Sequence, residues 1–108
     1  MGKFIIKKTA TGFKFDLKAG NGEPILASEV YTTKPACENG IESVKKNSAI
    51  ETRFEKKTST SGQFYFNLKA SNGQVIGTSE MYNTAVSMEN GIKSVMKNGP
   101  DSPVVDES

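Results

Sequence analysis

The side chains best suited to chemistry in this chain of 108 residues lie in two short, matching motifs. Each motif places a serine, a glutamate and a tyrosine in the same order, as Ser28-Glu29-Val30-Tyr31 and as Ser79-Glu80-Met81-Tyr82. A glutamate and a tyrosine this close could hold a ligand or act as an acid–base pair. The alternative is structural: the carboxylate accepts backbone N–H groups at a helix start, and the tyrosine covers the core. We favour the structural interpretation, because acidic side chains are common at such positions.

A second set of candidate residues alternates along two predicted strands, on the side away from the core. Residues 13–19 and 64–70 alternate apolar and polar side chains, which is typical of a strand with one buried face. Lysines with an interleaved aromatic ring can hold single-stranded nucleic acid through phosphate contacts and stacking. The alternative is an ordinary solvated sheet face, which a net charge of only +2 favours. The candidate residues of this face are Lys14, Lys18, Tyr65 and Lys69.

The composition excludes most kinds of catalytic centre. The chain has no histidine and one cysteine, Cys37, so it lacks Ser–His and Cys–His pairs and a zinc site made from these residues. Cys37 sits at an apolar helical position and is interpreted as a buried small side chain. Glu38 and Glu89 are expected on the solvent side of helices, and the carboxylates lack the spacing of known metal motifs. We therefore expect no enzymatic activity, no cofactor and no metal.

The cysteine count and the N-terminal segment bear on the compartment. A lone cysteine forms no disulfide within the chain, which suits a reducing environment. The apolar run in residues 1–7 is too short for a signal peptide or a membrane span. The sequence thus predicts a soluble cytoplasmic protein with no membrane partner. The sequence identifies no other partner.

An internal repeat is the strongest signal in the sequence. Residues 13–47 and 64–98 align at an offset of 51, with 20 identities in 35 pairs. Farther upstream the offset becomes 50 and pairs Phe4 with Phe54. Each unit reads as three strands, with Asn-Gly turns at residues 21–22 and 72–73, followed by a helix. The chain is therefore a duplicated unit of about 50 residues.

The two predicted helices share an unusual feature. Apolar residues recur at helical spacing, and Thr33 and Thr84 stand where N-caps are expected. Gly40 and Gly91 fall inside these helices, where glycine costs about 1 kcal/mol relative to alanine. We expect each glycine to allow the close approach of another part of the structure. The apolar residues are Cys37, Ile41 and Val44 in the first helix and Met88, Ile92 and Val95 in the second.

These motifs together resemble the YegP-like family of small bacterial proteins. The resemblance rests on Leu-Lys-Ala at the end of a strand, Asn-Gly, Ser-Glu-x-Tyr and Glu-Asn-Gly-Ile-x-Ser-Val, each present twice. It implies an α+β fold in which the two units share a sheet and exchange their terminal strands. It implies no activity, because the family is uncharacterised.

The sequence predicts one α+β domain over residues 1–108, built from two β-β-β-α repeats at about 3–48 and 53–99. A link of about five residues, 48–52, requires the repeats to pack on each other with pseudo-two-fold symmetry. We expect one mostly antiparallel sheet, two helices on one face, a partly flexible tail at 100–108, and a monomer. The expected function is that of a non-catalytic interaction or accessory protein. The alternative is weak binding of single-stranded nucleic acid or anions on the exposed sheet face.

Overall fold

The computed structural model describes residues 2–108, so Met1 of the N-terminal segment lies outside the described residues. Each repeat supplies three strands and one helix in the same order, as predicted. The first repeat contains β1 (Lys3–Lys8), β2 (Phe13–Lys18), β3 (Pro24–Ala27) and α1 (Lys34–Asn47). The second contains β4 (Phe54–Thr58), β5 (Phe64–Lys69), β6 (Val75–Thr78) and α2 (Ala85–Asn98). A short 3-10 helix, Glu51–Arg53, precedes β4, and β7 (Val104–Asp106) follows α2.

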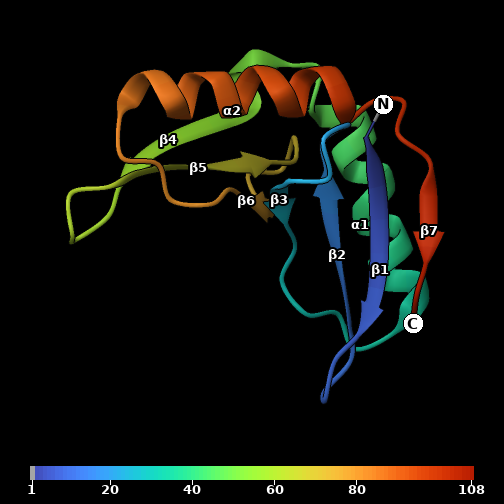
Figure 1. The fold of residues 1–108 in the computed structure, drawn as a ribbon. Coiled ribbons are helices and arrows are strands. Elements are labelled where there is room, and N and C mark those ends of the chain that lie inside the picture. Colours follow the sequence, from blue (N-terminus) through green and yellow to red (C-terminus); the bar gives the residue numbers. More distant parts are fainter. Residues whose placement is uncertain (1) are drawn as a thin grey trace.

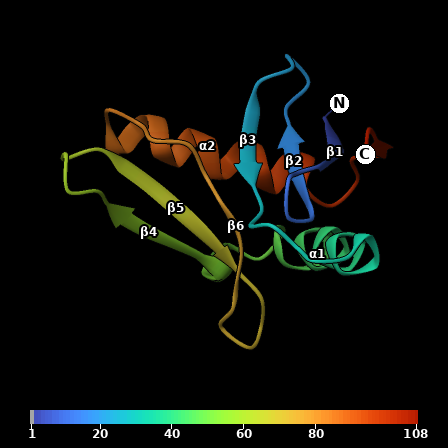
Figure 2. The same cartoon turned by 90° about the horizontal axis from the view of Figure 1, so that it is seen from below.

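The strands form one sheet in the order β4-β5-β6-β3-β2-β1-β7. Neighbouring strands are antiparallel except for β1 and β7, which are parallel. The two repeats meet at β3 and β6, where Ala27 pairs with Thr78. Figures 1 and 2 show that the strands of the two repeats run in very different directions on either side of this junction. The predicted shared, mostly antiparallel sheet is confirmed.

Both helices cover the same face of the sheet and tie the repeats together. Helix α1 contacts β5 and β6 of the other repeat as well as β2, and α2 contacts β2 and β3 as well as β5. Figure 1 shows α2 lying across β4 and β5 and α1 behind β1 and β2. Because each helix packs on strands of both repeats, the two repeats share a single core. Its largest fully buried side chains are Phe4, Ile6, Phe15, Leu17, Leu26, Ile41, Phe66 and Leu68.

The predicted helix starts are confirmed. The Thr33 hydroxyl accepts a hydrogen bond from the Ala36 backbone N–H, and the Thr84 hydroxyl accepts one from that of Ser87. Pro35 lies in the first turn of α1, where its missing N–H leaves no helical bond unmade. Neither helix has the length and hydrophobicity needed to cross a lipid bilayer, within the part of the chain that the structure describes.

The helix glycines make the close approach that the sequence predicted. A Cβ placed on Gly40 would lie 2.5 Å from the hydroxyl oxygen of Tyr31 and 3.0 Å from the ring of Phe15. A Cβ on Gly91 would overlap the hydroxyl of Tyr82. Each tyrosine stacks on a core phenylalanine, Tyr31 on Phe15 with ring centroids 6.4 Å apart. The glycines therefore leave room for a tyrosine that lies between the helix and the sheet.

The segment 100–108, which the sequence left without a regular element, contains strand β7. The Phe4 N–H donates to the Pro103 carbonyl and the Glu107 N–H to the Ile6 carbonyl, each at 2.8 Å. Asp106 also forms an ion pair with Lys34 at the start of α1. The three residues of β7 are all exposed, so they do not show the alternation of buried and exposed side chains from which a strand can be predicted. Only their pairing with β1 identifies them as a strand.

The implied exchange of terminal strands occurs in one direction only. Strand β7 follows the second helix and pairs with β1 of the first repeat. The chain that follows α1 instead runs through Glu51–Arg53 directly into β4, so among residues 2–108 no matching strand pairs with the outer edge of β4. A short link between the repeats leaves no chain for a second exchange.

Candidate functional site

The serines of the two Ser-Glu-x-Tyr motifs hold backbone rather than a ligand. The Ser28 hydroxyl accepts from the Phe15 N–H at 2.9 Å and donates to the Glu29 carbonyl at 2.7 Å. Ser79 makes the matching bonds to Phe66 and Glu80, at 3.0 and 2.8 Å. Each hydroxyl thus ties the chain that leaves the third strand to the central strand of its own repeat.

The tyrosines of these motifs are part of the core. Both Tyr31 and Tyr82 are half-buried and pack against the core cluster. Burial raises the pKa of the Tyr31 hydroxyl above its ordinary value of 10.0, and the nearby Glu29 carboxylate and Cys37 raise it further. Burial, followed by Glu80, raises the pKa of Tyr82 in the same way. Both phenols therefore stay protonated at neutral pH and are poorly suited to act as general bases.

The glutamates of these motifs do not have the capping role that the structural interpretation gave them. Within residues 2–108, no backbone N–H donates to the carboxylate of Glu29 or Glu80, and the serine hydroxyls bind the backbone at these turns instead. Both glutamates are exposed. The two carboxylates are thus not used by the fold, whereas the serines and tyrosines are.

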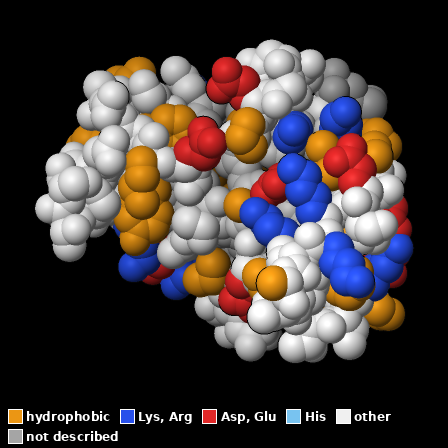
Figure 3. Space-filling model, turned by 60° about the horizontal axis from the view of Figure 1, so that its bottom comes forward, with side chains coloured by type: hydrophobic (Ala, Val, Ile, Leu, Met, Phe, Trp, Pro, Cys, Tyr) orange, Lys and Arg blue, Asp and Glu red, His pale blue; other side chains and the backbone are white. Residues whose placement is uncertain are grey.

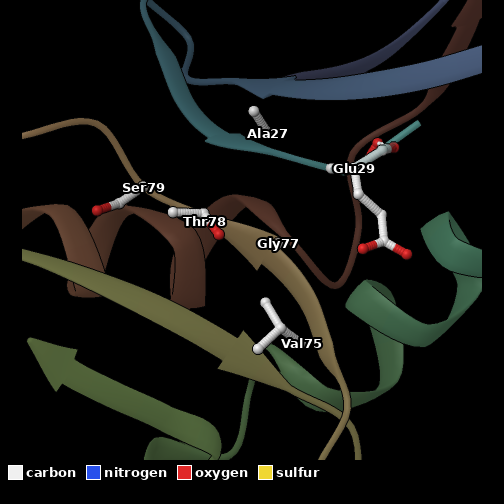
Figure 4. A pocket seen from close by; sticks show the side chains of 7 residues that line it. Ala27, Glu29, Val75, Gly77, Thr78 and Ser79 are labelled. Atoms are coloured by element: carbon white, nitrogen blue, oxygen red, sulfur yellow. Dashed lines mark hydrogen bonds between the residues drawn. The ribbon is translucent and has the colours of Figure 1, made fainter.

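Glu29 lies beside a hollow between the two repeats. One cavity of about 290 Å³ is lined by Ala27, Ser28, Glu29, Val75, Gly77, Thr78 and Ser79. A second, of about 250 Å³, is lined by Glu29, Tyr31, Gln74, Val75 and Ile76. Because they share Glu29 and Val75, we treat them as one feature, the junction groove. Figure 4 shows side chains from the end of β3 on one side and from β6 on the other. Glu80 lines neither cavity.

The outward residues singled out from the sequence do not form one surface. Lys14 and Lys18 lie on β2, and Tyr65 and Lys69 lie on β5, with β3 and β6 between them. Three strand spacings separate the two pairs by roughly 14 Å or more. The predicted alternation is present, since Phe15 and Leu17 are buried, whereas Lys14, Asp16 and Lys18, which alternate with them, are partly exposed.

The first repeat gathers lysines on this outward face. The register of β1 and β2 places Lys3 opposite Lys18 and Lys7 opposite Lys14. Side chains directly opposite each other lie about 5 Å apart at Cβ, and like charges in such pairs are destabilising. We call these four residues the lysine face. Figure 3 shows Lys and Arg side chains gathered over the half of the molecule that holds β1 and β2.

Few carboxylates balance the lysine face. Asp16 lies in its middle and pairs with Lys14 at 3.2 Å, and Glu107 lies at its edge, where its N–H bonds to Ile6. Within residues 2–108, no carboxylate lies within 4.0 Å of the ammonium groups of Lys3, Lys7 or Lys18. The lysine face is therefore an electropositive surface that internal ion pairs leave largely unneutralised.

On the equivalent surface of the second repeat, one carboxylate contacts two lysines. Glu55 replaces the Ile5 of the first repeat and lies 3.0 Å from the ammonium of Lys69 and 3.6 Å from that of Lys57. The Lys69 hydrogen bond, with Lys57 nearby, lowers the pKa of Glu55 below its ordinary range. Tyr65 therefore lies on a surface where the lysines are paired with a carboxylate, and β3 and β6 separate it from the lysine face.

No catalytic arrangement is found among the remaining reactive groups of residues 2–108. Cys37 is fully buried, as its spacing predicted, and burial raises the pKa of its thiol. A protonated buried thiol is a weak nucleophile. Within the same range, no group of three or more acidic or cysteine side chains could hold a metal ion. Glu38 is exposed, as expected, whereas Glu89 is half-buried and pairs with Lys56 at 2.6 Å.

Sequence reasoning missed half of the lysine face. Lys3 and Lys7 alternate with Phe4 and Ile6, so their outward direction is visible in the sequence. Their importance depends on the register of β1 against β2, which brings the lysines together in pairs. A hairpin alignment through the turn at residues 9–12 would have shown these pairs.

A model of a domain of unknown function, DUF1508, matches the chain twice, over residues 9–55 and 59–106. The chain is similar to the UPF0339 protein YegP of Escherichia coli K12, with 56% identity over 102 residues, covering 94% of this chain and 93% of that protein. It is also similar to a UPF0339 protein of Shewanella oneidensis, with 54% identity over 100 residues and coverage of 93% and 91%.

Two solution NMR structures are similar to this fold over nearly the whole chain. One is that of YegP from E. coli, a protein of unknown function, with a TM-score of 0.93 and 55% identity, covering 98% of this chain and 92% of the other. The other is a UPF0339 protein from Shewanella oneidensis, with a TM-score of 0.92 and 52% identity, covering 97% and 90%. The tandem architecture is thus common to these bacterial proteins.

Proposed function

The chain belongs to the DUF1508 family of tandem-repeat proteins, and on that premise we propose that it is a non-catalytic binding protein whose lysine face holds the phosphates of single-stranded nucleic acid. One observation carries the proposal: two lysine pairs stand directly opposite each other on neighbouring strands. Such pairs oppose folding, so a bound polyanion that neutralises them would stabilise the native state.

The geometry supports backbone binding without base recognition. Lys3 and Lys7 are four residues apart on one strand, a separation of about 13 Å, so the two lysine pairs can contact different phosphates of one strand. Between the two lysine pairs lie Ile5, which is buried, and Asp16, and neither side chain can stack on a base. We therefore expect affinity that depends on charge and little on sequence.

The test is a titration of the labelled protein with a mixed-sequence single-stranded oligonucleotide, followed by amide chemical shifts at several salt concentrations. Each phosphate contact contributes about −0.7 to the slope of log K against log salt for single strands. The double variant Lys3→Gln/Lys18→Gln should reduce the magnitude of that slope by about 1.4. The matched control is Lys57→Gln/Lys69→Gln, which removes the same charge from the second repeat and should leave the slope nearly unchanged.

Tyr65 distinguishes this proposal from binding across the whole sheet. Because β3 and β6 separate Tyr65 from the lysine face, Tyr65→Ala should leave the affinity unchanged. A loss of about 1–3 kcal/mol would instead indicate that the ring stacks on a base and that the site spans both repeats. An equal loss of binding in both lysine double variants would show that net charge, and not the lysine face, is responsible.

A further inference from the structure

We infer that the junction groove is a binding site for an aliphatic ammonium group, with Glu29 as its counter-ion. The groove is independent of the lysine face and has the opposite charge. No lysine or arginine lines either of its two cavities, and Glu29 is the one ionisable carboxylate that lines both. A cation that enters the groove therefore meets a single negative charge with no competing internal partner.

The carboxylate of Glu29 is available for such a ligand. Within residues 2–108, no ammonium or guanidinium group lies within 4.0 Å of it, and no backbone N–H donates to it. The hydroxyls of Ser28 and Ser79 already bind the backbone, and that of Thr78 donates to Asn67 at 2.8 Å. The hydroxyls of Ser28, Ser79 and Thr78 thus already have partners, whereas the carboxylate of Glu29 has none within the same range of residues.

The shape of the groove limits the size of the ligand and requires an apolar part. Volumes of about 290 and 250 Å³ stand at or below the lower end for small-molecule sites. Val75 is 41% exposed and, with Ala27 and Gly77, offers an apolar surface beside the carboxylate. An ammonium group on a short alkyl chain fits this combination. Both a free diamine and the lysine side chain of another protein present that chemistry.

The internal symmetry supplies a built-in comparison. Glu80 corresponds to Glu29, but the positions that correspond to Val75 and Gly77 are Pro24 and Leu26. The Leu26 side chain extends over Gly77, so that a Cβ on Gly77 would lie 2.6 Å from its methyl carbon. Only one of the two related glutamates therefore lines the groove, and Glu80 is a matched control for Glu29.

The experiment is a chemical-shift titration of the full chain with putrescine, with uncharged butanediol as the control ligand. We expect saturable shifts at the amides of Ala27, Gly77 and Thr78 with the diamine and none with the diol. Because a charge-assisted hydrogen bond is lost, Glu29→Gln should weaken binding about tenfold, whereas Glu80→Gln should leave it unchanged. Val75→Phe, which fills the groove without altering charge, should also abolish the shifts.

A second arm distinguishes the source of the ammonium group. Tighter binding of a short lysine-containing peptide than of putrescine would assign the groove to a protein partner, and the reverse order would assign it to a free amine. The inference is overturned if neither probe gives saturable shifts, if Glu29→Gln responds like the parent protein, or if Glu80→Gln loses as much affinity. Retained amide dispersion in each variant shows that loss of binding is not loss of folding.

Discussion

At the scale of single residues, the two helix glycines are explained by the tyrosines that face them. Tyr31 lies between α1 and the sheet, stacked on Phe15 with the ring planes 12° apart. A methyl group on Gly40 would meet the phenol oxygen, its ring carbon and the Phe15 ring at once. Packing of the tyrosine therefore requires glycine at this position, although glycine has a low helix propensity.

We predict that Gly40→Ala destabilises the protein although alanine is the better helix former. Overpacking costs about 1–3 kcal/mol, which outweighs the propensity gain of about 1 kcal/mol. Unfolding by urea, monitored by circular dichroism, measures the net change. The same substitution in a Tyr31→Phe background should cost less, because the hydroxyl at 2.5 Å is gone. A stabilising Gly40→Ala would contradict the close-packing explanation.

The Asp106–Lys34 ion pair predicts a pH dependence at the acid end. The hydrogen bond from Lys34, with those from Ser108, lowers the pKa of Asp106 from 3.8 to about 2. A carboxyl group with a lowered pKa stabilises the native state above its unfolded pKa, and that contribution is lost as the pH falls through the folded value. Unfolding free energies between pH 4 and pH 2 should therefore fall more steeply in the parent protein than in Asp106→Asn. Equal slopes, or an Asp106 titration midpoint near 4, would contradict the role of the pair.

At the scale of elements, the two edges of the sheet differ in a way that β7 explains. Strand β1 carries Ile5 and Ile6, and β7 covers its edge. The matching residues of β4, the strand at the other edge of the sheet, are Glu55 and Lys56. Charged side chains on an open edge hinder pairing with another molecule. The two repeats have thus diverged: β1 is paired with the short strand β7, which forms that edge of the sheet, whereas β4 is itself an edge strand and carries charge.

We predict that removing residues 103–108 lowers stability and promotes self-association. The deletion removes the pairing of β7 with β1, including the hydrogen bonds of the Phe4 and Glu107 N–H groups, a loss of about 1–3 kcal/mol, and leaves β1 as an apolar edge strand. Size-exclusion chromatography with light scattering would show the association. Adding Ile5→Glu to the truncated chain copies the arrangement in β4, where the matching Glu55 pairs with Lys69, and should restore the monomer. A truncated chain that stays monomeric would show that β7 does not protect this edge.

The sequence predicted those elements whose pattern is local. These patterns each involve only a few neighbouring positions. They are the alternation in β2 and β5, the threonine caps at Thr33 and Thr84, and the helical spacing of the core residues. Strand β7 and the lysine face depend on distant pairing, because Val104 becomes a strand residue only beside Phe4. The groove depends on two repeats meeting at one residue pair, which no local pattern describes.

At the scale of the whole molecule, fusion of the two repeats has allowed their junction to become asymmetric. Leu26 and Gly77 occupy equivalent positions near the pseudo-two-fold axis, and Leu26 is buried with its side chain over Gly77. Two leucines could not both fit there, and two glycines would leave a void. One large and one small residue fill the space, an arrangement that two identical subunits could not adopt.

We predict that exchanging these two residues restores the stability that each single change removes. Gly77→Leu should destabilise by about 1–3 kcal/mol through overpacking, and Leu26→Gly by about 2–5 kcal/mol through the cavity it leaves. The double variant Leu26→Gly/Gly77→Leu should be more stable than the sum of the single changes implies, by about 1 kcal/mol or more. Chemical denaturation of the four proteins measures this coupling. Additive effects would show that the two positions do not share one space.

The crossing of the helices also predicts that the chain unfolds as one cooperative monomer. Helix α1 packs on β5 and β6, and α2 packs on β2 and β3, so neither repeat keeps its core if the other unfolds. Calorimetric and van't Hoff enthalpies of thermal unfolding should therefore agree, with one transition and a midpoint independent of protein concentration. Hydrogen exchange supplies the local test. The amides of Phe15 and Phe66, one from each repeat, should exchange with the same free energy as global unfolding. A lower exchange free energy in one repeat would reveal a separate folding unit, and a concentration-dependent midpoint would reveal an oligomer.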